Sequence, residues 1–244
     1  MNDTFRASVD TYLAEEYVPI KIAFRERLAQ AAMETCRRRL GFAGIKAFCK
    51  CRAKSKESMR AKLEKLWRRG EWETLIDLRS LEYLDFVGVR ICLYFLSQAQ
   101  VVQEILQSEP SFHVVQVRGF GHLDDADSNV SADPNVRSHL GRTGAYDAKH
   151  FWVDVHGNHE ARSKDELGVA ASRVEIQVRS AFMEPWAEIQ HDLAYKMVPQ
   201  GPGEEESRIL KDMREASASC EMMAEQLKAV CERRADRRRR RSKM

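Results

Sequence analysis

The stretch from Phe86 to Phe95 limits the possible folds of this 244-residue chain more than any other segment. Nearly every side chain in it is apolar, β-branched or aromatic, so both faces of the strand it predicts need to be covered. Three further strands are predicted at 113–118, 150–155 and 173–178, and the middle of the chain then reads strand, helix, strand, loop, strand, loop, strand. This order predicts an α/β or α+β fold with a sheet covered by helices.

Helices are predicted on both sides of these strands. Residues 4–40 have apolar positions every three to four residues, with a break at Pro19. Ser55 can act as the N-cap of a second helix over 56–69, and a short third helix is predicted over 71–84. Three more helices are predicted at 97–108, 181–196 and 204–234.

The predicted C-terminal helix carries apolar residues at alternating four- and three-residue steps, which lay one seam along three heptads. The seam either packs against its own domain or meets a second protomer, in which case the protein is a homo-oligomer. After the helix, residues 235–244 form a basic tail that we expect to be disordered and that could attract the phosphates of RNA. The seam consists of Ile209, Met213, Ala216, Cys220, Met223, Leu227 and Val230.

The charge balance is nearly even, with 40 Lys and Arg against 37 Asp and Glu, and much of the net charge of +3 lies between Arg233 and Lys243. The globular part is therefore close to neutral. No apolar run approaches the ~20 residues needed to cross a bilayer, and the N-terminal residues lack a signal-peptide pattern. The six cysteines are scattered and form no zinc set. We expect a cytoplasmic protein with reduced thiols and no membrane association.

A group of polar residues surrounds the start of the second predicted helix. In Arg52-x-Lys54-x-x-x-Ser58-x-x-x-Lys62, Ser58 and Lys62 lie four residues apart on one helix face. Arg52 and Lys54 precede the positive end of the helix dipole. Such an arrangement can hold a polyphosphate, although a solvated basic helix face has the same spacing.

The strand at 86–95 contains one charge, Arg90, in a run that should be buried on both sides. A buried guanidinium needs a partner or a ligand. Gly88 lies two residues earlier on the same face and leaves room beside it. The motif Asp85-x-x-Gly88-x-Arg90 is thus either part of a ligand site or a structural ion pair of Arg90 with Asp85 or Glu175.

The last predicted strand has one polar face, because strand alternation places Glu175, Gln177 and Arg179 together. Such a face meets water or a substrate. If the strands that carry Asp85 and Glu175 are neighbours, the two carboxylates could share a Mg²⁺ ion, which is typically held by one or two carboxylates plus substrate phosphates. The sequence alone does not make these strands neighbours.

Residues 119–144 are rich in Gly, Asp, Asn and Ser and predict a mobile loop that serves a site. The loop leads into Gly144-Ala-Tyr146-Asp-Ala-Lys149-His150. A tyrosine beside such a loop can stack on a nucleobase, a contact worth ~1–3 kcal/mol, or it can belong to the core.

The order of these motifs resembles that of the RelA/SpoT family of alarmone synthetases over residues 45–197, as a small single-domain member. The resemblance is carried by R-x-K-x-x-x-S-x-x-x-K, D-x-x-G-x-R, a Gly-Tyr-type loop ending in His, E-I-Q-V-R and W-A-E-I-x-H-x-x-x-Y-K. It implies a nucleotidyltransferase-like mixed sheet of about five strands flanked by helices, with N-terminal helices over 1–44 and a C-terminal helix. It also implies Mg²⁺-dependent transfer of the β,γ-pyrophosphate of ATP to the 3′-hydroxyl of GDP or GTP, giving ppGpp or pppGpp.

The resemblance assigns roles to individual positions. Asp85 would ligate Mg²⁺, Glu175 would either complete the metal site or take the proton from the 3′-hydroxyl, and Gln177 would steady the acceptor. ATP would be bound by Arg52, Lys54, Ser58, Lys62 and Arg90, of which the two arginines would sandwich the adenine or clamp phosphate. The acceptor would be bound by Arg142, Tyr146, Lys149 and His150. The site would be braced by Arg179, His191, Tyr195 and Lys196.

The sequence departs from the family on the acceptor side. Where the family commonly has Gly-Tyr-Arg-Ser-x-His, this chain has an extra Ala145 before the tyrosine, and Asp147 and Ala148 in place of Arg and Ser. An acid in place of a cation weakens a contact to acceptor phosphates, for which Arg137, Arg142 or Lys149 could compensate from the loop. The alternatives are therefore pyrophosphorylation of a tRNA 3′ end or of an adenosine nucleotide, and a non-catalytic nucleotide or RNA sensor.

Overall fold

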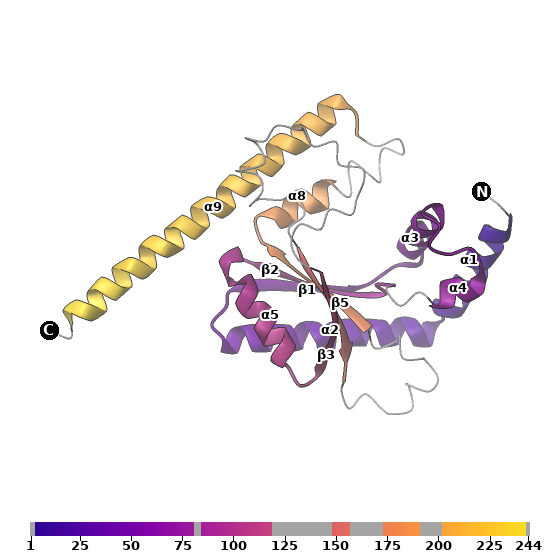
Figure 1. The fold of residues 1–244 in the computed structure, drawn as a ribbon, viewed down its shortest axis with the longest axis horizontal. Helices are drawn as coiled ribbons and strands as arrows, with labels where there is room; N and C mark the ends of the chain where they lie inside the picture. The colour runs from indigo at the N-terminus through magenta and orange to yellow at the C-terminus, as the bar shows by residue number, and fades with distance from the viewer. Residues whose placement is uncertain (1–2, 81–83, 119–147, 157–172, 191–201, 243–244) are drawn as a thin grey trace.

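A mixed sheet of five strands lies at the centre of the molecule (Figure 1). The strand order is β1-β2-β5-β4-β3, in which β2 and β5 are parallel and every other neighbouring pair is antiparallel. The inner position of β2 confirms the prediction drawn from the apolar run at 86–95, and the sheet confirms the α+β class. The strands are β1 (Ala47–Ala53), β2 (Val87–Leu93), β3 (Phe112–Arg118), β4 (Lys149–Val155) and β5 (Arg173–Ser180).

This computed structural model describes residues 3–80, 84–118, 148–156, 173–190 and 202–242. Within these ranges, no helix has the length and apolar character needed to cross a membrane. The helices are α1 (Asp3–Glu16), α2 (Pro19–Phe42), α3 (Lys56–Arg68), α4 (Leu75–Ser80), the short 3₁₀ helix η1 (Leu96–Gln98), α5 (Ala99–Ser108), α8 (Met183–Ile189) and α9 (Glu204–Arg241).

The edge strand β1 was not among the strands predicted from sequence. Its residues alternate between small apolar side chains, such as Cys49 and Cys51, that pack on the core, and the cations Lys50 and Arg52 on the other face. Ala and Cys bury too little surface to give a strong strand signal, although the period of two is present. The sequence pattern placed Arg52 and Lys54 together before the helix. In the structure Arg52 lies on β1, and only Lys54 and Ser55 lie in the turn before α3.

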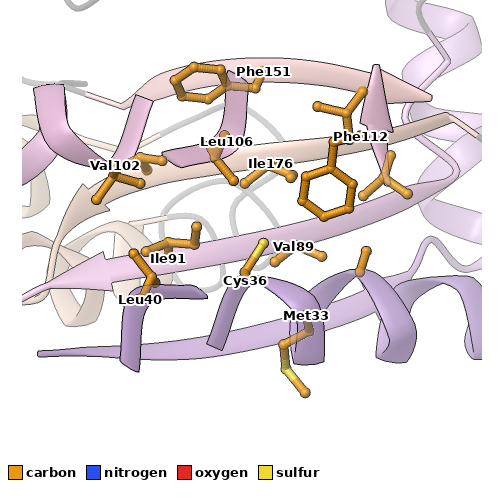
Figure 2. Packing of buried hydrophobic residues seen from close by; sticks show 14 of the residues in the cluster. Met33, Cys36, Leu40, Val89, Ile91, Val102, Leu106, Phe112, Phe151 and Ile176 are labelled. Atoms are coloured by element: carbon orange, nitrogen blue, oxygen red, sulfur yellow. The ribbon is translucent and has the colours of Figure 1, made fainter. Parts of the chain in front are cut away.

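One face of the sheet is apolar and is covered by α2 and α5 (Figure 1). Fully buried side chains from the inner strands, among them Ile91, Phe151 and Ile176, meet Leu40 of α2 and Leu106 of α5 in this core (Figure 2). Every second residue of β1, β2, β4 and β5 points toward this side, because side chains alternate along a strand. In β3 the register shifts between Val114 and Gln116.

A second cluster of buried side chains joins α1, α3 and α4 beside the sheet. Phe5, Leu63 and Trp72 are fully buried there, and the Trp72 indole donates to the carbonyl of Leu63 at 3.0 Å. The third helix predicted over 71–84 is shorter in the structure, since α4 begins only at Leu75. Thr74 caps it, because the Asp77 carboxylate accepts from the Thr74 amide at 2.9 Å and the Thr74 hydroxyl accepts from the Asp77 amide at 3.2 Å.

The C-terminal helix α9 extends to Arg241, beyond the end predicted near residue 234. The expectation of a disordered tail from 235 is therefore wrong for residues 235–241. Arginine is a good helix former, and cations are favourable at the negative end of the helix dipole. None of the described side chains of α9 is buried, and among the described elements the helix contacts mainly α8 and η1.

Candidate active site

The polar face of the sheet carries an open pocket of about 200 Å³. Gly88 at its floor pairs with Arg52 on β1 and with Glu175 on β5, so the missing side chain opens the space between these two residues. This parallel pairing of β2 with β5 brings Asp85, just before β2, close to Glu175. The pocket is lined by Lys50, Cys51, Arg52, Lys54, Asp85, Gly88, Val89, Arg90, Glu175, Gln177 and Glu188.

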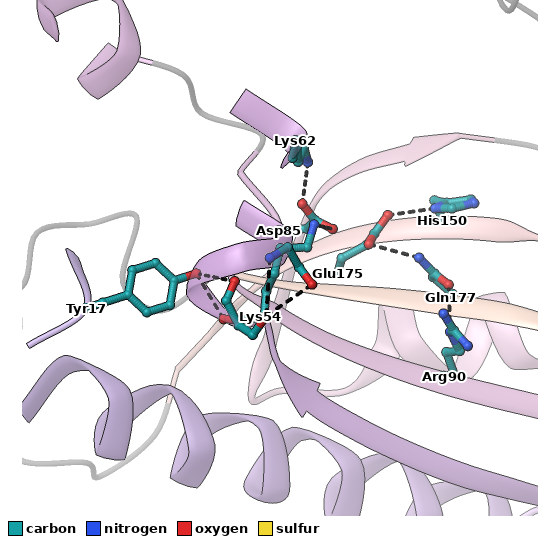
Figure 3. A network of polar contacts seen from close by, with 10 residues as sticks. Tyr17, Lys54, Lys62, Asp85, Arg90, His150, Glu175 and Gln177 are labelled. Carbon is teal, nitrogen blue, oxygen red and sulfur yellow. Dashed lines mark hydrogen bonds and ion pairs between the residues drawn. The ribbon is translucent and has the colours of Figure 1, made fainter. Parts of the chain in front are cut away.

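Asp85 lies between two lysines (Figure 3). Its Oδ2 accepts from Lys54 Nζ at 2.6 Å, and its other oxygen accepts from Lys62 Nζ of α3. Burial alone would raise the pKa of Asp85, but the charges of Lys62 and Lys54 outweigh it and hold the pKa below its ordinary value. For Lys54 burial dominates and lowers the pKa, despite the attraction of Asp85. The ammonium of Lys54 is thus a poorly hydrated charge that another anion could stabilise.

Glu175 is the second carboxylate of the pocket and is 8% exposed. Oε1 lies 2.7 Å from Nδ1 of His150, and Oε2 accepts from Gln177 Nε2 at 3.0 Å (Figure 3). The His150 ring in turn stacks on Trp152, with 5.8 Å between ring centroids. Glu175 is therefore held from two sides, by an imidazole that can carry a proton and by a neutral amide.

Arg90 bridges the sheet and α8. Its Nε donates to Gln177 Oε1 at 3.2 Å, and its Nη1 forms ion pairs with Glu184 at 2.9 Å and with Glu188. The two acids lie four residues apart on α8, so they share one helix face. The sequence offered Asp85 or Glu175 as ion-pair partners for Arg90, and the structure corrects this, because the acids come from α8.

Glu184 is a buried carboxylate of α8 that forms ion pairs with cations on the polar face of the sheet. It pairs with Lys50, with Arg90 and, at 2.8 Å, with Arg179. Burial opposes ionisation, but the hydrogen bond from Lys50 and the charges of Arg179 and Arg90 lower the pKa of Glu184 to about 2. The carboxylate is therefore charged at all physiological pH values. The bracing role predicted for Arg179 stays a prediction, and the structure gives Glu184 as the ion-pair partner of Arg179.

Most of the predicted site residues that the structure describes lie together. Ser58 lies in the first turn of α3, where its amide donates to Ser55 Oγ at 3.2 Å, so the predicted cap is confirmed. Lys149 is a correction: alternation along β4 turns it to the other face of the sheet from His150, where it donates to Gln103 of α5 at 2.9 Å. The predicted residues outside the described ranges are Arg142, Tyr146, His191, Tyr195 and Lys196.

Three charged residues were missed from sequence, two that line the pocket and Glu184, which pairs with two of its cations. Lys50 shares the polar face of β1 with Arg52, and the period-two pattern of that strand could have identified it. Glu184 and Glu188 could have been recognised only as an acid pair at helical spacing. What they bind depends on how α8 docks on the sheet, which no local pattern encodes.

Two carboxylates of the pocket could contribute to a Mg²⁺ site, but they would not form a complete site by themselves. Asp85 and Glu175 offer hard carboxylate oxygens at one pocket. Among the residues that the structure describes, no cluster of three or more His, Cys, Asp or Glu could hold a metal by itself. Phosphate oxygens of a bound ligand would have to complete the coordination, and this is the usual arrangement for Mg²⁺.

Fold and pocket together define an α+β protein whose sheet has one core face and one face that presents paired carboxylates among cations. Residues 51–199 match the model of the region found in RelA / SpoT proteins, and the chain belongs to that family. No curated protein sequence matches the chain.

The fold is that of small alarmone synthetases. Small alarmone synthetase 1 from Bacillus subtilis superposes with a TM-score of 0.63 at 20% identity, covering 87% of this chain and 96% of that chain. The same protein bound to AMPCPP gives 0.61 at 21% identity, covering 87% and 96%. A GTP pyrophosphokinase family protein from Streptococcus pneumoniae gives 0.58 at 21% identity, covering 89% and 93%.

Proposed function

We propose that the protein is a (p)ppGpp synthetase, an ATP:GTP/GDP 3′-pyrophosphotransferase. The observation that carries the proposal is the meeting of Asp85 and Glu175, 90 positions apart in the chain, in one pocket lined with cations. Membership of the RelA/SpoT family supports it, as does the fold, which is shared with a synthetase solved with AMPCPP and with its product pppGpp.

The donor half of the reaction would use the cations around Asp85. Arg52 is exposed at the pocket and forms no ion pair with the described residues, so it is available to ATP. Lys54 and Lys62 pair with Asp85 in the structure and would turn to the triphosphate, whose charge is larger than that of one carboxylate. Phosphoryl-type transfer needs in-line placement and neutralised charge rather than a covalent nucleophile, and these groups can supply both.

Asp85 and Glu175 would hold Mg²⁺ together with the triphosphate. Bound there, the ion would offset the negative charge that develops on the transferred and leaving oxygens. As the lysines leave Asp85 for phosphate, the carboxylate becomes available as a ligand. We therefore expect metal and triphosphate to bind together. The triphosphate would draw the two lysines away from Asp85 and free it for the metal, and the metal would occupy Asp85 and free the lysines for the triphosphate.

The acceptor half would use Glu175 and His150. Glu175 either completes the metal site or accepts the proton of the 3′-hydroxyl, and His150 at 2.7 Å can share that proton or reach the acceptor. Gln177 holds the other oxygen of Glu175 and thereby its orientation. A product assay that compares guanosine nucleotides, adenosine nucleotides and tRNA identifies the preferred acceptor.

The test is a product assay with γ-labelled ATP and Mg²⁺ across GDP, GTP, ADP, ATP and tRNA. We expect AMP and a guanosine nucleotide that carries a 3′-pyrophosphate, and Asp85→Asn should abolish both while the fold is retained. Glu64→Gln, at a half-exposed position of α3 that is paired with Arg68, is the matched control and should keep the rate. A folded protein that releases no AMP with any acceptor would contradict the proposal. A product formed on tRNA or on an adenosine nucleotide would keep the transfer reaction but change its acceptor from a guanosine nucleotide to that molecule.

We further propose that α9 pairs with α9 of a second copy. The face of the helix toward its own body carries Leu210, Glu225 and Lys228, which contact α8, η1 and the segment before η1. The apolar seam lies beside that face, and its members Met223 and Leu227 are 56% and 64% exposed. An antiparallel pair would bury two such seams and set the acidic start of one helix opposite the arginine-rich end of the other.

Light scattering tests this pairing. Leu227→Glu places a charge in the seam and should lower the mass to that of the monomer. Met222→Glu makes the same kind of change at an exposed position outside the seam and should leave the mass of the oligomer unchanged. A monomeric wild-type chain, or equal masses for all three proteins, would contradict the pairing.

A further inference from the structure

Tyr17, in the joint between α1 and α2, reaches the turn that begins the donor half of the pocket. Its hydroxyl lies 2.9 Å from the carbonyl of Lys54 and 3.1 Å from that of Ser55, and shares its proton between them (Figure 3). Lys54 and Ser55 form the connection between β1 and α3. The joint lies 37 residues earlier in the chain and outside the region matched by the family model, which begins at residue 51.

The side chains around Tyr17 also hold the segment that carries Asp85. The Arg25 guanidinium lies 3.8 Å from the ring centroid of Phe86 and 5.6 Å from that of Tyr17. Arg25 is itself 6% exposed, donates to the Glu16 carbonyl at 2.7 Å and pairs with the Glu16 carboxylate. Phe86 directly follows Asp85, and its carbonyl accepts from the amide of Lys54 at 2.7 Å.

These contacts connect the joint between α1 and α2 to both partners of the Lys54–Asp85 ion pair. The backbone of Lys54 is held by Tyr17 at its carbonyl and by Phe86 at its amide, while the Lys54 ammonium meets the carboxylate of the residue before Phe86. Burial raises the pKa of Tyr17 to about 12, so the hydroxyl stays a donor at neutral pH. Loss of that donor would remove the Tyr17 hydrogen bond from the Lys54 carbonyl and allow the turn to shift, whereas the Ser55 carbonyl would still accept from the Met59 amide at 2.9 Å.

We infer that Tyr17 is a positioning residue for the donor triphosphate, acting through the backbone of Lys54 and Ser55. The inference rests on the proposed function, because it assigns the turn to ATP. Tyr17 touches no substrate in this account. Its hydroxyl sets where the Lys54 ammonium and the first turn of α3 stand relative to Asp85.

The chain offers a matched control in Tyr12. Its ring lies on the same phenylalanine, 6.4 Å from the Phe86 centroid against 6.3 Å for Tyr17, and its hydroxyl forms no hydrogen bond with a described residue. Tyr17→Phe and Tyr12→Phe therefore remove the same atom from the two neighbouring rings. Only the first removes a contact to the Lys54–Ser55 turn.

Two measurements on the full chain test the inference. Calorimetric titration with AMPCPP and Mg²⁺ should give a dissociation constant that rises roughly 5- to 10-fold in Tyr17→Phe, the loss expected for one hydrogen bond, and stays within about twofold in Tyr12→Phe. In steady-state kinetics the KM for ATP should rise with it, while the KM for the acceptor stays unchanged.

Three results would overturn the inference. They are unchanged AMPCPP affinity in Tyr17→Phe, an equal loss in both variants, and a melting temperature of Tyr17→Phe far below that of Tyr12→Phe, which would assign the hydroxyl to general stability. A wild-type chain that binds AMPCPP yet forms no product would refute the proposed transfer alone, since the titration still decides the role of Tyr17. A wild-type chain that fails to bind AMPCPP would refute both.

Discussion

The two faces of the sheet are built from the same five strands and differ in almost every property. One face is apolar, lies under α2 and α5 and contains fully buried residues such as Ile91 and Ile176. The other presents charged side chains, of which Glu175 and Arg90 belong to the same strands as those two isoleucines. Alternation along a strand therefore lets neighbouring residues serve stability and chemistry separately. Substituting neighbours one at a time tests how complete that separation is.

The largest effect is expected on the core face, from Ile176→Ala. Ile176 is fully buried among the inner strands, so its truncation leaves a cavity and should lower the free energy of unfolding by about 2–5 kcal/mol. At low temperature the folded fraction should keep its kcat within about twofold, because the site lies on the other face. Denaturant unfolding and an activity assay on the same sample measure both quantities. A large loss of kcat in the folded protein would show that the faces are coupled.

The next substitution, Glu175→Gln, is one residue away on the opposite face. The amide keeps the size of the side chain and can still bond to Gln177 and His150, so stability should change little. The loss of the charge should lower kcat by about 10²–10³-fold, as is typical when one preorganised electrostatic contact is removed. Steady-state assays measure the loss of kcat, and thermal melting measures whether the stability is unchanged. Wild-type turnover in this variant would remove Glu175 from the mechanism.

Much of this division could be predicted from sequence, because it depends on local period. The apolar run before Tyr94 predicted the inner strand, and the alternation of Glu175 and Gln177 predicted a polar face. The partner of Arg90 could not be predicted, since Glu184 reaches it only after α8 docks on the sheet. β1 was missed because the Ala and Cys side chains on its core face bury little surface and give a weak apolar pattern. Lys50, which lies on that strand, was missed with it.

The docking of α8 on the polar face should depend on pH through Glu184. Its pKa falls from 4.5 to about 2 on folding, so its contribution is complete above pH 4.5 and is lost as the pH falls from there toward 2. The shift corresponds to roughly 3 kcal/mol. Unfolding of wild type and Glu184→Gln from pH 7 to pH 2.5 should show a gap that closes with falling pH. Glu188→Gln, whose side chain is 44% exposed, should show a much smaller gap. A gap independent of pH would contradict this account.

The smallest effect is expected from Lys149→Gln. The family resemblance placed Lys149 at the acceptor, but the structure turns it toward Gln103 of α5, on the far side of the sheet from the pocket. Its removal should therefore change kcat/KM by less than about twofold, with a stability change within about 0.5 kcal/mol. His150→Asn, one residue along β4, removes the ring that contacts Glu175 and should lower kcat/KM by at least about tenfold. A reversed order of the two effects would mean that β4 presents its other face to the acceptor, and the separation of core and site would fail at that strand.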